Sequence, residues 1–316
     1  MTISVALCTY NGEKYIKEQL LSILQQETPV DEIIICDDGS SDNTIQIIDD
    51  IRENFSHVIH FYHNETSLGV CANFQKAVNL CSGDIIFLSD QDDIWYPNKT
   101  HATIEWFLNN PDKNAVFSNA TLIDENGTYI PNGVLFDRIG FRKEHRNIFN
   151  NGLGILLFMD NNRATGACMA IKKKYDFLPY CSDSILHDEI IAALAIQDNS
   201  LGYIEQPLVK YRLHGNNNVG LPSEEKARLR YDKKHLLAPV YHESKVRFWK
   251  FELSPIAQRH IKMLKCRNRM LTSKFGLFSI ICHYPAYKKT YSPLGNIFFH
   301  FDISQKIKGI KKTLFK

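Results

Sequence analysis

The chain has 316 residues, of which 44% are hydrophobic and 23% charged, and its formal net charge is +2. Such a chain can bury a sizeable core, in one large domain with an appendage or in two domains. No hydrophobic stretch approaches the roughly 20 residues that cross a bilayer. Met1 to Val5 enter a strand pattern directly, without a basic region or a cleavage site. We therefore expect a cytoplasmic protein without a signal peptide.

Charge is distributed unevenly along the chain. Residues 226–316 contain 21 Lys or Arg against 4 Asp or Glu, a net charge of +17, which leaves 16 against 31, or −15, in residues 1–225. Asymmetry on this scale indicates two separate tasks. We predict a globular domain at 1–220 and a basic, mainly helical region at 221–316 that associates with something anionic.

The eight cysteines include no CxxC pair, and several lie in apolar, strand-like segments. Buried free cysteines behave as small hydrophobic side chains. We expect reduced thiols here, rather than zinc ligands or disulfides.

Strand and helix patterns alternate in the first 90 residues. Strands are predicted at 3–10, 32–36, 57–63 and 85–88, and helices at 15–24, 45–51 and 72–80. This alternation predicts an α/β fold, in which a mostly parallel sheet is covered on both faces. The chain has neither a GxGxxG motif after the first strand nor a GxxxxGK[ST] motif, so dinucleotide-binding and P-loop sites are excluded.

Three polar clusters follow the predicted strands: Thr9-Tyr10, Asp37-Asp38, and the acidic group Asp90 to Asp93. In parallel sheets, ligands bind outside the carboxyl ends of the strands. The three clusters therefore predict a single site at one edge of the sheet.

The acidic group places three carboxylates within four residues, directly after the apolar strand Ile85 to Leu88. Mg²⁺ and Mn²⁺ bind oxygen ligands, often one or two carboxylates together with the phosphates of a substrate. Asp90-Gln91-Asp92 is therefore interpreted as a site for a metal and a diphosphate. A solvated acidic turn is the alternative that these residues alone leave open.

Six segments, taken in order, resemble glycosyltransferase family 2 with the GT-A fold, and more narrowly its bacterial rhamnosyltransferase-type members. They span about the first 220 residues and are Val5–Gly12, Ile34–Asp42, Ser82–Trp95, Ala164–Met169, Leu186–Glu189 and Val209–Asn217. The resemblance implies a GT-A, Rossmann-like fold with a mostly parallel central sheet, followed by the basic helical region.

The resemblance also implies roles for residues on the nucleotide side. Tyr10 matches the position that packs on the nucleotide base, with Thr9 beside it, and Asp38 matches a carboxylate that accepts a hydrogen bond from the base. Asp90 matches the first acid of the DxD motif, which faces the ribose. Without the family context, Tyr10 is an ordinary aromatic at a strand end and Asp38 a turn residue before glycine.

On the reaction side, Asp92 matches the acid that holds the metal, and His214 the histidine of the YRxHG segment that contacts the diphosphate or the metal. Asp188 matches the catalytic base. Alternatively, Asp188 is a helix N-cap and His214 a structural histidine. The implied cofactor is Mn²⁺ or Mg²⁺, which neutralises the departing diphosphate.

A single base acting on the acceptor hydroxyl predicts inversion at the anomeric carbon in one step, without the covalent intermediate of retaining glycosidases. Relatives commonly place an aromatic residue after the base, whereas Glu189 stands here. Adjacent helical residues point about 100° apart, so only one of Asp188 and Glu189 can face the acceptor. We assign Asp188 as the base and place Glu189, Asp93 and Trp95 on the acceptor side.

The segment 115–163 is expected to shape the acceptor site. A strand is predicted at 115–124, a turn at Asp124 to Gly127, and a loop-rich stretch with several arginines at 133–163.

Basic residues alternate with apolar ones after residue 224, a pattern typical of membrane-surface helices. No nucleic-acid motif accompanies this charge, so no nucleic-acid partner is expected. A solvated helical domain is the alternative. The first interpretation predicts peripheral attachment to the inner face of the cell membrane, and a lipid-linked or oligosaccharide acceptor.

Taken together, these expectations describe an enzyme that moves a sugar from a nucleotide donor, dTDP-rhamnose or a UDP-sugar, to a bacterial surface glycan. The alternatives are a sugar nucleotidyltransferase, whose glycine-rich triphosphate loop is missing from this sequence, and an inactive module that binds nucleotide sugars.

Overall fold

The computed structural model describes residues 1–150, 162–172, 174–181, 185–215, 255–273, 276–290, 299–300 and 302–307. The chain divides into two compact units, the first formed by residues 1–139 and 163–222 and the second by 140–162 and 223–316. The division into domains at residue 220 stays a prediction. The compact units show in addition that 140–162 group with the later part of the chain.

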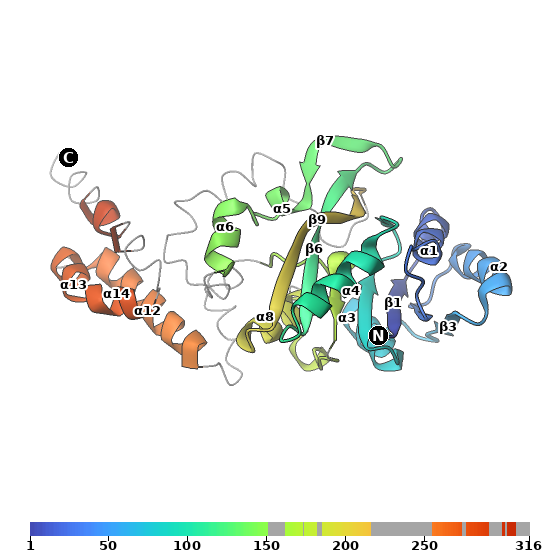
Figure 1. Cartoon of the computed structure of the whole chain (residues 1–316), viewed down its shortest axis with the longest axis horizontal. Coiled ribbons are helices and arrows are strands. Elements are labelled where there is room, and N and C mark those ends of the chain that lie inside the picture. Colours follow the sequence, from blue (N-terminus) through green and yellow to red (C-terminus); the bar gives the residue numbers. More distant parts are fainter. Residues whose placement is uncertain are drawn as a thin grey trace. The chain divides into compact units, whose positions relative to one another are not determined.

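A nine-stranded sheet forms the centre of the first unit (Figure 1). Along the sheet the strands are β3 (Ile59–His63), β2 (Glu32–Asp37), β1 (Ile3–Thr9), β4 (Ile85–Ser89), β8 (Met169–Ile171), β6 (Ala115–Ile123), β9 (Leu201–Arg212) and β5 (Ile94–Trp95), with β7 (Tyr129–Val134) paired to β6. Strands β5, β7 and β8 run against the other six. The predicted α/β fold with a mostly parallel sheet is confirmed.

The sheet is buried on both faces where its strands are most apolar. All five residues of β4 are buried, and so are six of the seven residues of β1. In the register of the ladders, Leu7 lies opposite Ser89 and Thr9 opposite Asp37. The carboxyl ends of β1, β2 and β4 therefore meet at one edge, as predicted.

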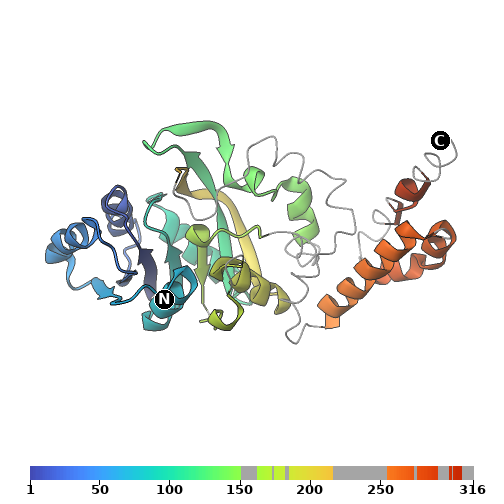
Figure 2. The ribbon, with the colours of Figure 1, turned by 180° about the vertical axis from the view of Figure 1, so that it is seen from behind.

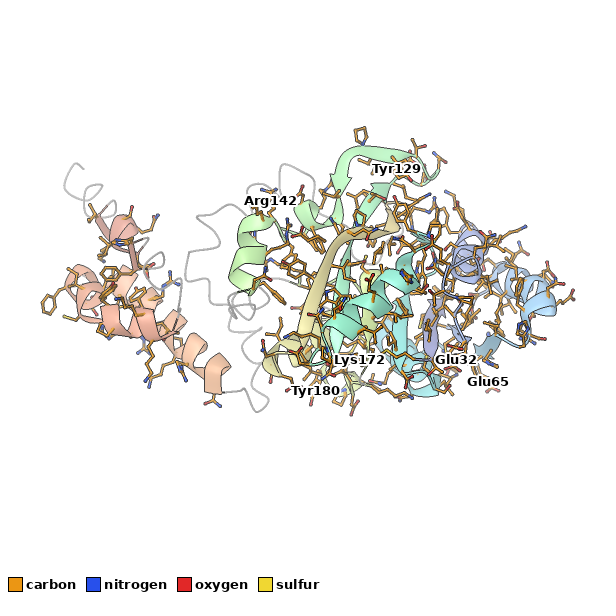
Figure 3. All side chains as sticks on the ribbon, in the orientation of Figure 1. Glu32, Glu65, Tyr129, Arg142, Lys172 and Tyr180 are labelled. Carbon is orange, nitrogen blue, oxygen red and sulfur yellow. A yellow bond between two sulfur atoms is a disulfide. The ribbon has the colours of Figure 1, made fainter. Side chains whose placement is uncertain are left out.

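The opposite ends of these strands are also tied together. Glu32, labelled in Figure 3, accepts hydrogen bonds from the backbone nitrogen of Ser82 (2.5 Å) and from its hydroxyl (3.0 Å). Gly83 packs so closely that a Cβ there would lie 2.5 Å from Ser4 Oγ. This close approach explains why the chain enters β4 through a glycine.

Seven α-helices and two short 3₁₀ helices are described between residues 1 and 215 (Figures 1 and 2). They are α1 (Ile16–Leu24), α2 (Thr44–Phe55), α3 (Val70–Leu80), α4 (Lys99–Asn109), α5 (Leu135–Arg138), α6 (Lys143–Ile148), η2 (Gly166–Cys168), η3 (Leu178–Tyr180) and α8 (His187–Gln197). Helix α3 packs against β1 and β2, and α8 packs against α3, β6 and β9.

The segment 115–163 follows the predictions in part. The predicted strand is β6, and the predicted turn is closed by a hydrogen bond from Gly127 N to Asp124 O (3.0 Å). The stretch predicted as loop-rich instead forms the end of β7 and the short helices α5 and α6. These helices are only 4 and 6 residues long, too short for an apolar period to show in the sequence. Residues 151–161 lie outside the described part of the chain.

A disulfide joins Cys71, in the first turn of α3, to Cys181, just after η3. The expectation of eight reduced cysteines is therefore wrong for this pair, whereas the other six are free. The two partners are 110 residues apart in sequence, and no spacing motif indicates such a pair. They meet because η3 packs against α3.

The second unit includes the helices α12 (Pro255–Thr272), α13 (Gly276–Cys282) and α14 (Tyr284–Thr290), and a further turn of helix at 302–307. Arg267 and Asp302 form a buried two-point ion pair (2.6 and 2.9 Å), and Tyr287 donates to the same carboxylate (2.5 Å). Within the described residues, no helix combines the length and the apolar character needed to cross a membrane.

Candidate active site at the carboxyl edge of the sheet

Two loops at the edge, after β1 and after β2, are linked by reciprocal hydrogen bonds. Asn11 donates its backbone N–H to Ser40 Oγ (2.9 Å), and its side-chain oxygen accepts from Ser41 N (2.8 Å). Gly12 N donates to Thr44 Oγ1 (2.7 Å). Asn11 adopts a left-handed backbone conformation with φ of 48°, which asparagine tolerates better than most residues. The two loops therefore form one rigid rim.

Thr9 and Tyr10, both predicted to bind the nucleotide, differ sharply in exposure. Thr9 is buried and donates to Asp37 Oδ2 (2.8 Å), whereas Tyr10 is 56% exposed. The Tyr10 backbone exchanges two hydrogen bonds with the side-chain amide of Gln91, at 2.9 and 3.0 Å. Gln91 thus links the end of β1 to the acidic turn and leaves the Tyr10 ring free to face solvent or a ligand.

Asp38 accepts hydrogen bonds through both of its carboxylate oxygens. Its Oδ1 accepts from Asn64 Nδ2 (2.8 Å) and Leu68 N (2.7 Å), and its Oδ2 accepts from Ser67 Oγ (2.7 Å) and Gly69 N (2.9 Å). Burial alone raises the pKa of Asp38, but these four donors outweigh it and hold the pKa below its usual value. Four bonds occupy about all the lone pairs of a carboxylate. Asp38 therefore shapes the loop 64–69.

The acidic turn after β4 has few donors by comparison. Asp92 Oδ2 lies 2.8 Å from His214 Nε2, and the His214 ring packs 5.0 Å from that of Tyr15. Burial, followed by the charges of Asp92 and Asp188, raises the pKa of Asp90 to about 7. The start of α8 therefore lies within electrostatic range of the acidic turn, although about 100 residues separate them in sequence.

Asp93 and Trp95, predicted on the acceptor side, are only 2% and 3% exposed. Asp93 Oδ1 accepts from Arg212 N (2.9 Å), and its buried Oδ2 has no hydrogen-bond partner within the described residues. Burial, with the charges of Asp92 and Asp90, raises the pKa of Asp93 well above its usual value. Because both side chains are buried, neither is included in the proposed acceptor site.

Lys99 is a buried cation that the sequence reasoning missed. Its Nζ donates to Ala167 O (2.9 Å) and lies 3.8 Å from the centre of the Trp95 ring. Burial lowers the pKa of Lys99 to about 8, although the charges of Asp90 and Asp93 work in the other direction. Lys99 thus balances part of the negative charge under the acidic turn. Nothing in its helical sequence context indicates burial.

Asp188 lies in the first turn of α8, so the alternative reading as its N-cap is wrong; Leu186 holds that position. Gly166 N donates to Asp188 Oδ2 (3.2 Å). A Cβ at Gly166 would lie 2.8 Å from His187 Nε2, so only glycine allows η2 to approach α8 this closely. Glu189 is 8% exposed, whereas Asp188 is less buried.

The residues at the edge fit a divalent cation held jointly with a substrate. Within the described part of the chain, no group of three or more His, Cys, Asp or Glu side chains is arranged to hold a metal ion. Asp92 and His214 form a pair, and next to them Asp93 keeps a buried carboxylate oxygen unpaired. One or two protein ligands completed by diphosphate oxygens are common for Mg²⁺.

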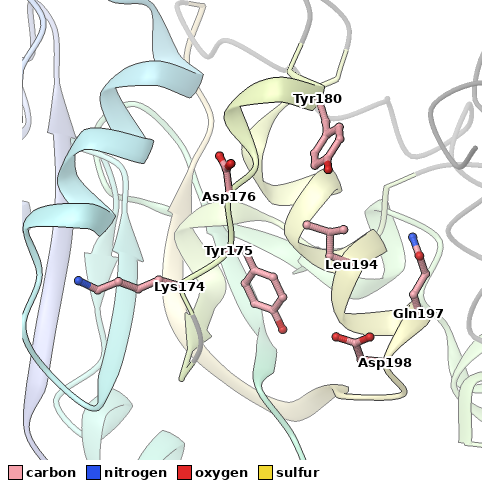
Figure 4. Close-up of a pocket in the computed structure, with 7 residues that line it drawn as sticks. All are labelled: Lys174, Tyr175, Asp176, Tyr180, Leu194, Gln197 and Asp198. Carbon is pink, nitrogen blue, oxygen red and sulfur yellow. The ribbon is translucent and has the colours of Figure 1, made fainter. Parts of the chain in front are cut away.

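A separate pocket of about 210 Å³ lies at the other end of α8 (Figure 4). Leu194, Gln197 and Asp198 line it from the helix side, and Lys174 to Asp176 with Tyr180 line it from the segment around η3. None of the predicted site residues lies in this pocket, and Asp188 belongs to the first turn of the same helix.

A sequence model of the family described as "Glycosyl transferase family 2" matches residues 4–176, more than half of the chain. The chain belongs to glycosyltransferase family 2. The matched residues include the loops after β1 and β2 and the acidic turn, but they end before Asp188 and His214. The roles of those two residues stay predictions.

Two relatives match beyond that range. A dTDP-rhamnosyl transferase of Shigella flexneri, RfbG, is 30% identical over 239 residues, covering 70% of this chain and 76% of the relative. An uncharacterized glycosyltransferase of Methanocaldococcus jannaschii is 31% identical over 265 residues, covering 78% of this chain and 84% of the relative.

Among solved structures, residues 1–349 of S. aureus TarS in complex with UDP-GlcNAc superpose with a TM-score of 0.54 at 15% identity, covering 97% of this chain and 89% of TarS 1–349. At this identity the likeness shows the fold alone. It agrees with the GT-A architecture expected for this family 2 glycosyltransferase.

Proposed function

We propose that this family 2 enzyme is a metal-dependent, inverting glycosyltransferase that moves a sugar from a nucleotide-diphosphate donor to a glycan acceptor. The supporting observation is that the acidic turn, His214 and the first turn of α8 converge at the edge where β1 and β2 end, beside Thr9, Tyr10 and Asp38. A nucleotide lying across β1 and β2 would direct its diphosphate toward Asp92.

For the donor, we propose dTDP-rhamnose first and a UDP-N-acetylhexosamine or UDP-hexose second. The name of the Shigella flexneri relative supports the first, and the ligand of TarS supports the second. Tyr10, more than half exposed beside the paired loops, is suited to stack on either base. Asp90 would face the ribose, as the resemblance to the family implies.

In the reaction, Asp92 and His214 would hold the cation, which supplies Lewis-acid neutralisation of the departing diphosphate. Asp188 would accept the proton of the acceptor hydroxyl as it attacks the anomeric carbon from the face opposite the leaving group. One displacement from that side inverts the anomeric centre, and no covalent glycosyl-enzyme forms.

The choice between Asp188 and Glu189 is supported by burial. Glu189 is nearly enclosed, whereas Asp188 is less buried and lies close enough to Asp90 for its charge to raise the pKa of Asp90. We expect Asp188→Asn to abolish sugar transfer and Glu189→Gln to retain it, with nucleotide affinity measured for both variants. Transfer by the first variant and inactivity of the second would reverse the assignment.

For the acceptor, we propose a saccharide presented at an anionic membrane surface, with the enzyme attached peripherally. Residues 226–316 have the net charge of +17, and α13 exposes Phe278 (73%) and Ile281 (53%). These two side chains lie three residues apart, on one face of the helix. Exposed apolar residues in a cationic region favour insertion at the surface of an anionic bilayer.

Vesicle sedimentation tests the membrane partner. We expect the full chain to sediment with phosphatidylglycerol vesicles but not with phosphatidylcholine vesicles, and the double variant Phe278→Ser/Ile281→Ser to lose most of this binding. Leu108→Ser, at an exposed apolar position of α4 (61%), is the matched control. Equal sedimentation of the chain and the double variant would contradict the proposal.

Slow hydrolysis of nucleotide sugars tests the enzyme proposal without knowledge of the acceptor, because water can replace it. The purified chain is incubated with dTDP-rhamnose and the common UDP-sugars, with Mn²⁺, with Mg²⁺ or with EDTA. Cleavage of one donor that stops in EDTA identifies the donor and the metal requirement. If no donor is cleaved, nucleotide binding is measured, and failure to bind any of them rejects the proposed function.

A further inference from the structure

Arg212, the last residue of β9, is a buried cation next to the acidic turn. It is 2% exposed. Its Nε donates to Asp92 O (2.8 Å), and its Nη2 forms an ion pair with Glu18 of α1 (2.5 Å). Its guanidinium lies 4.6 Å from the centre of the Tyr15 ring. One side chain therefore connects the acidic turn to the first helix.

Asp92 is held at both ends from the same stretch of chain. Arg212 binds its carbonyl oxygen, and His214, two residues further on, contacts its carboxylate at 2.8 Å. The backbone N–H of Arg212 holds the carboxylate of Asp93 (2.9 Å). The end of β9 thus determines both the path of the acidic turn and the direction of the Asp92 side chain.

A cation with only two protein ligands needs those ligands in place before the diphosphate arrives, because a freely rotating turn would lose entropy on binding. The planar guanidinium donates in several fixed directions at once, which a lysine ammonium cannot reproduce. Arg212 meets this requirement because it is buried and bound on separate sides by Asp92 and Glu18.

We propose that Arg212 is a positioning residue that orients Asp92 toward the cation bound with the donor diphosphate. The proposal rests on the proposed function and names a residue outside the set expected from the sequence. Arg212 would touch neither the sugar nor the acceptor. It would act through the Asp92 carbonyl, so its loss should weaken cation-assisted nucleotide binding and leave cation-free binding unchanged.

Isothermal titration of UDP and of dTDP into the full chain tests this, with Mn²⁺ and with EDTA, for Arg212→Met, Arg212→Lys and the parent chain. For the nucleotide that the parent binds, we expect Arg212→Met to lose about tenfold in affinity with Mn²⁺, as for the loss of one charged hydrogen bond. In EDTA the affinity should stay within about twofold, and Arg212→Lys should recover part of the loss.

Lys210→Met is the matched control, because Lys210 is a cation two residues earlier on the same face of β9 whose Nζ lies over the rings of Tyr96 and Tyr129, 5.6 Å from each ring centre. This variant should behave like the parent. Thermal unfolding of every variant identifies any that fail to fold. If Arg212→Met fails to fold, Glu18→Gln replaces it: Glu18 is 56% exposed, and its neutral form should reduce the Mn²⁺-dependent affinity about threefold.

Equal losses of nucleotide affinity with Mn²⁺ and with EDTA would overturn the proposal. So would an unchanged affinity of Arg212→Met in Mn²⁺. If that variant does not fold, an unchanged affinity of Glu18→Gln in Mn²⁺ would overturn it. Binding of neither nucleotide by the parent chain would reject the proposed function, and this inference with it. Normal Mn²⁺-dependent binding by the parent together with unchanged variants would reject only the role of Arg212.

Discussion

The turns after β2 and β4 both present consecutive carboxylates at the same edge of the sheet, but the protein treats them in opposite ways. Asp38 receives four hydrogen bonds from the loop 64–69, and they lower its pKa. Asp93 receives one hydrogen bond, and burial raises its pKa. Hydrogen bonds from the fold itself stabilise the charge of Asp38, whereas burial disfavours the charge of Asp93.

This difference suggests a structural role for Asp38 and a chemical role for the carboxylates of the acidic turn. A carboxylate whose lone pairs are occupied stabilises the loop that supplies the donors. A group of carboxylates with too few donors is costly in the folded state, unless a cation joins it. We therefore expect the similar sequences Asp-Asp-Gly, at the end of β2, and Asp-Gln-Asp-Asp, after β4, to have different functions. Substitutions in each turn should separate loss of stability from loss of activity.

The largest expected effect is that of Asp92→Asn in the acidic turn. The substitution keeps the size of the side chain and removes the charge that would hold the cation, so donor cleavage should fall about a thousandfold or more. Thermal stability should change little, because removing one negative charge also relieves the repulsion that Asp92 exerts on Asp90 and Asp93. A variant with full activity in Mn²⁺ would show that Asp92 is not a metal ligand.

Asp38→Ala should have the opposite profile. It leaves four donors without their acceptor, at a cost of about 2–3 kcal/mol in the free energy of unfolding, or roughly 5–10 °C in melting temperature for a unit of this size. Asp50→Ala, at an exposed position of α2, is the control. A stable Asp38→Ala variant would contradict the structural role of this carboxylate.

The pH dependence of stability also tests the structural role of Asp38. Because the pKa of Asp38 is lowered in the folded state, its contribution is present above the unfolded pKa of about 3.9 and is lost as the pH falls through the lower folded value. Urea unfolding at a series of pH values below about 5 should therefore show a shallower acid loss in Asp38→Ala than in the parent chain. Parallel curves would count against the four-donor arrangement.

The smallest expected effect concerns Gln91, which links the end of β1 to the acidic turn. Gln91→Ala removes the paired bonds to the Tyr10 backbone, which are exposed and therefore worth about 1 kcal/mol together. Nucleotide affinity should fall several-fold, about fivefold for that energy. Gln46→Ala, which removes one exposed side-chain bond to Asp50 (2.7 Å), should leave nucleotide affinity unchanged. Equal effects of the two substitutions on nucleotide affinity would show that the hydrogen bonds of Gln91 to Tyr10 play no part in nucleotide binding.

The sequence was sufficient to predict the order of strands and helices up to β4 and the shared edge, because both follow from local periodicity and from the direction of parallel strands. Arg212 and Lys99 escaped prediction because their burial depends on partners that are far away in sequence. Arg212 meets Asp92 across 120 residues, and Lys99 meets Ala167 across 68.

Asp38 shows another limit of sequence reasoning. Its position before glycine indicates a turn, and its family context implies contact with the base, but neither reveals that Ser67, Leu68 and Gly69 lie against it. Trp95 shows a similar limit: the sequence places it beside the acidic motif, on the acceptor side, but does not reveal that the short strand β5 directs its ring into the core.

The bridge between Cys71 and Cys181 encloses the acidic turn, α4 and the β6–β7 hairpin in one covalent ring. A protease that cleaves a single peptide bond anywhere between the two cysteines would open this ring without releasing a fragment. The nicked protein would migrate as one species on a gel until a reductant was added. Clipped and intact molecules of this enzyme are therefore indistinguishable by mass under non-reducing conditions, apart from the one water gained on hydrolysis.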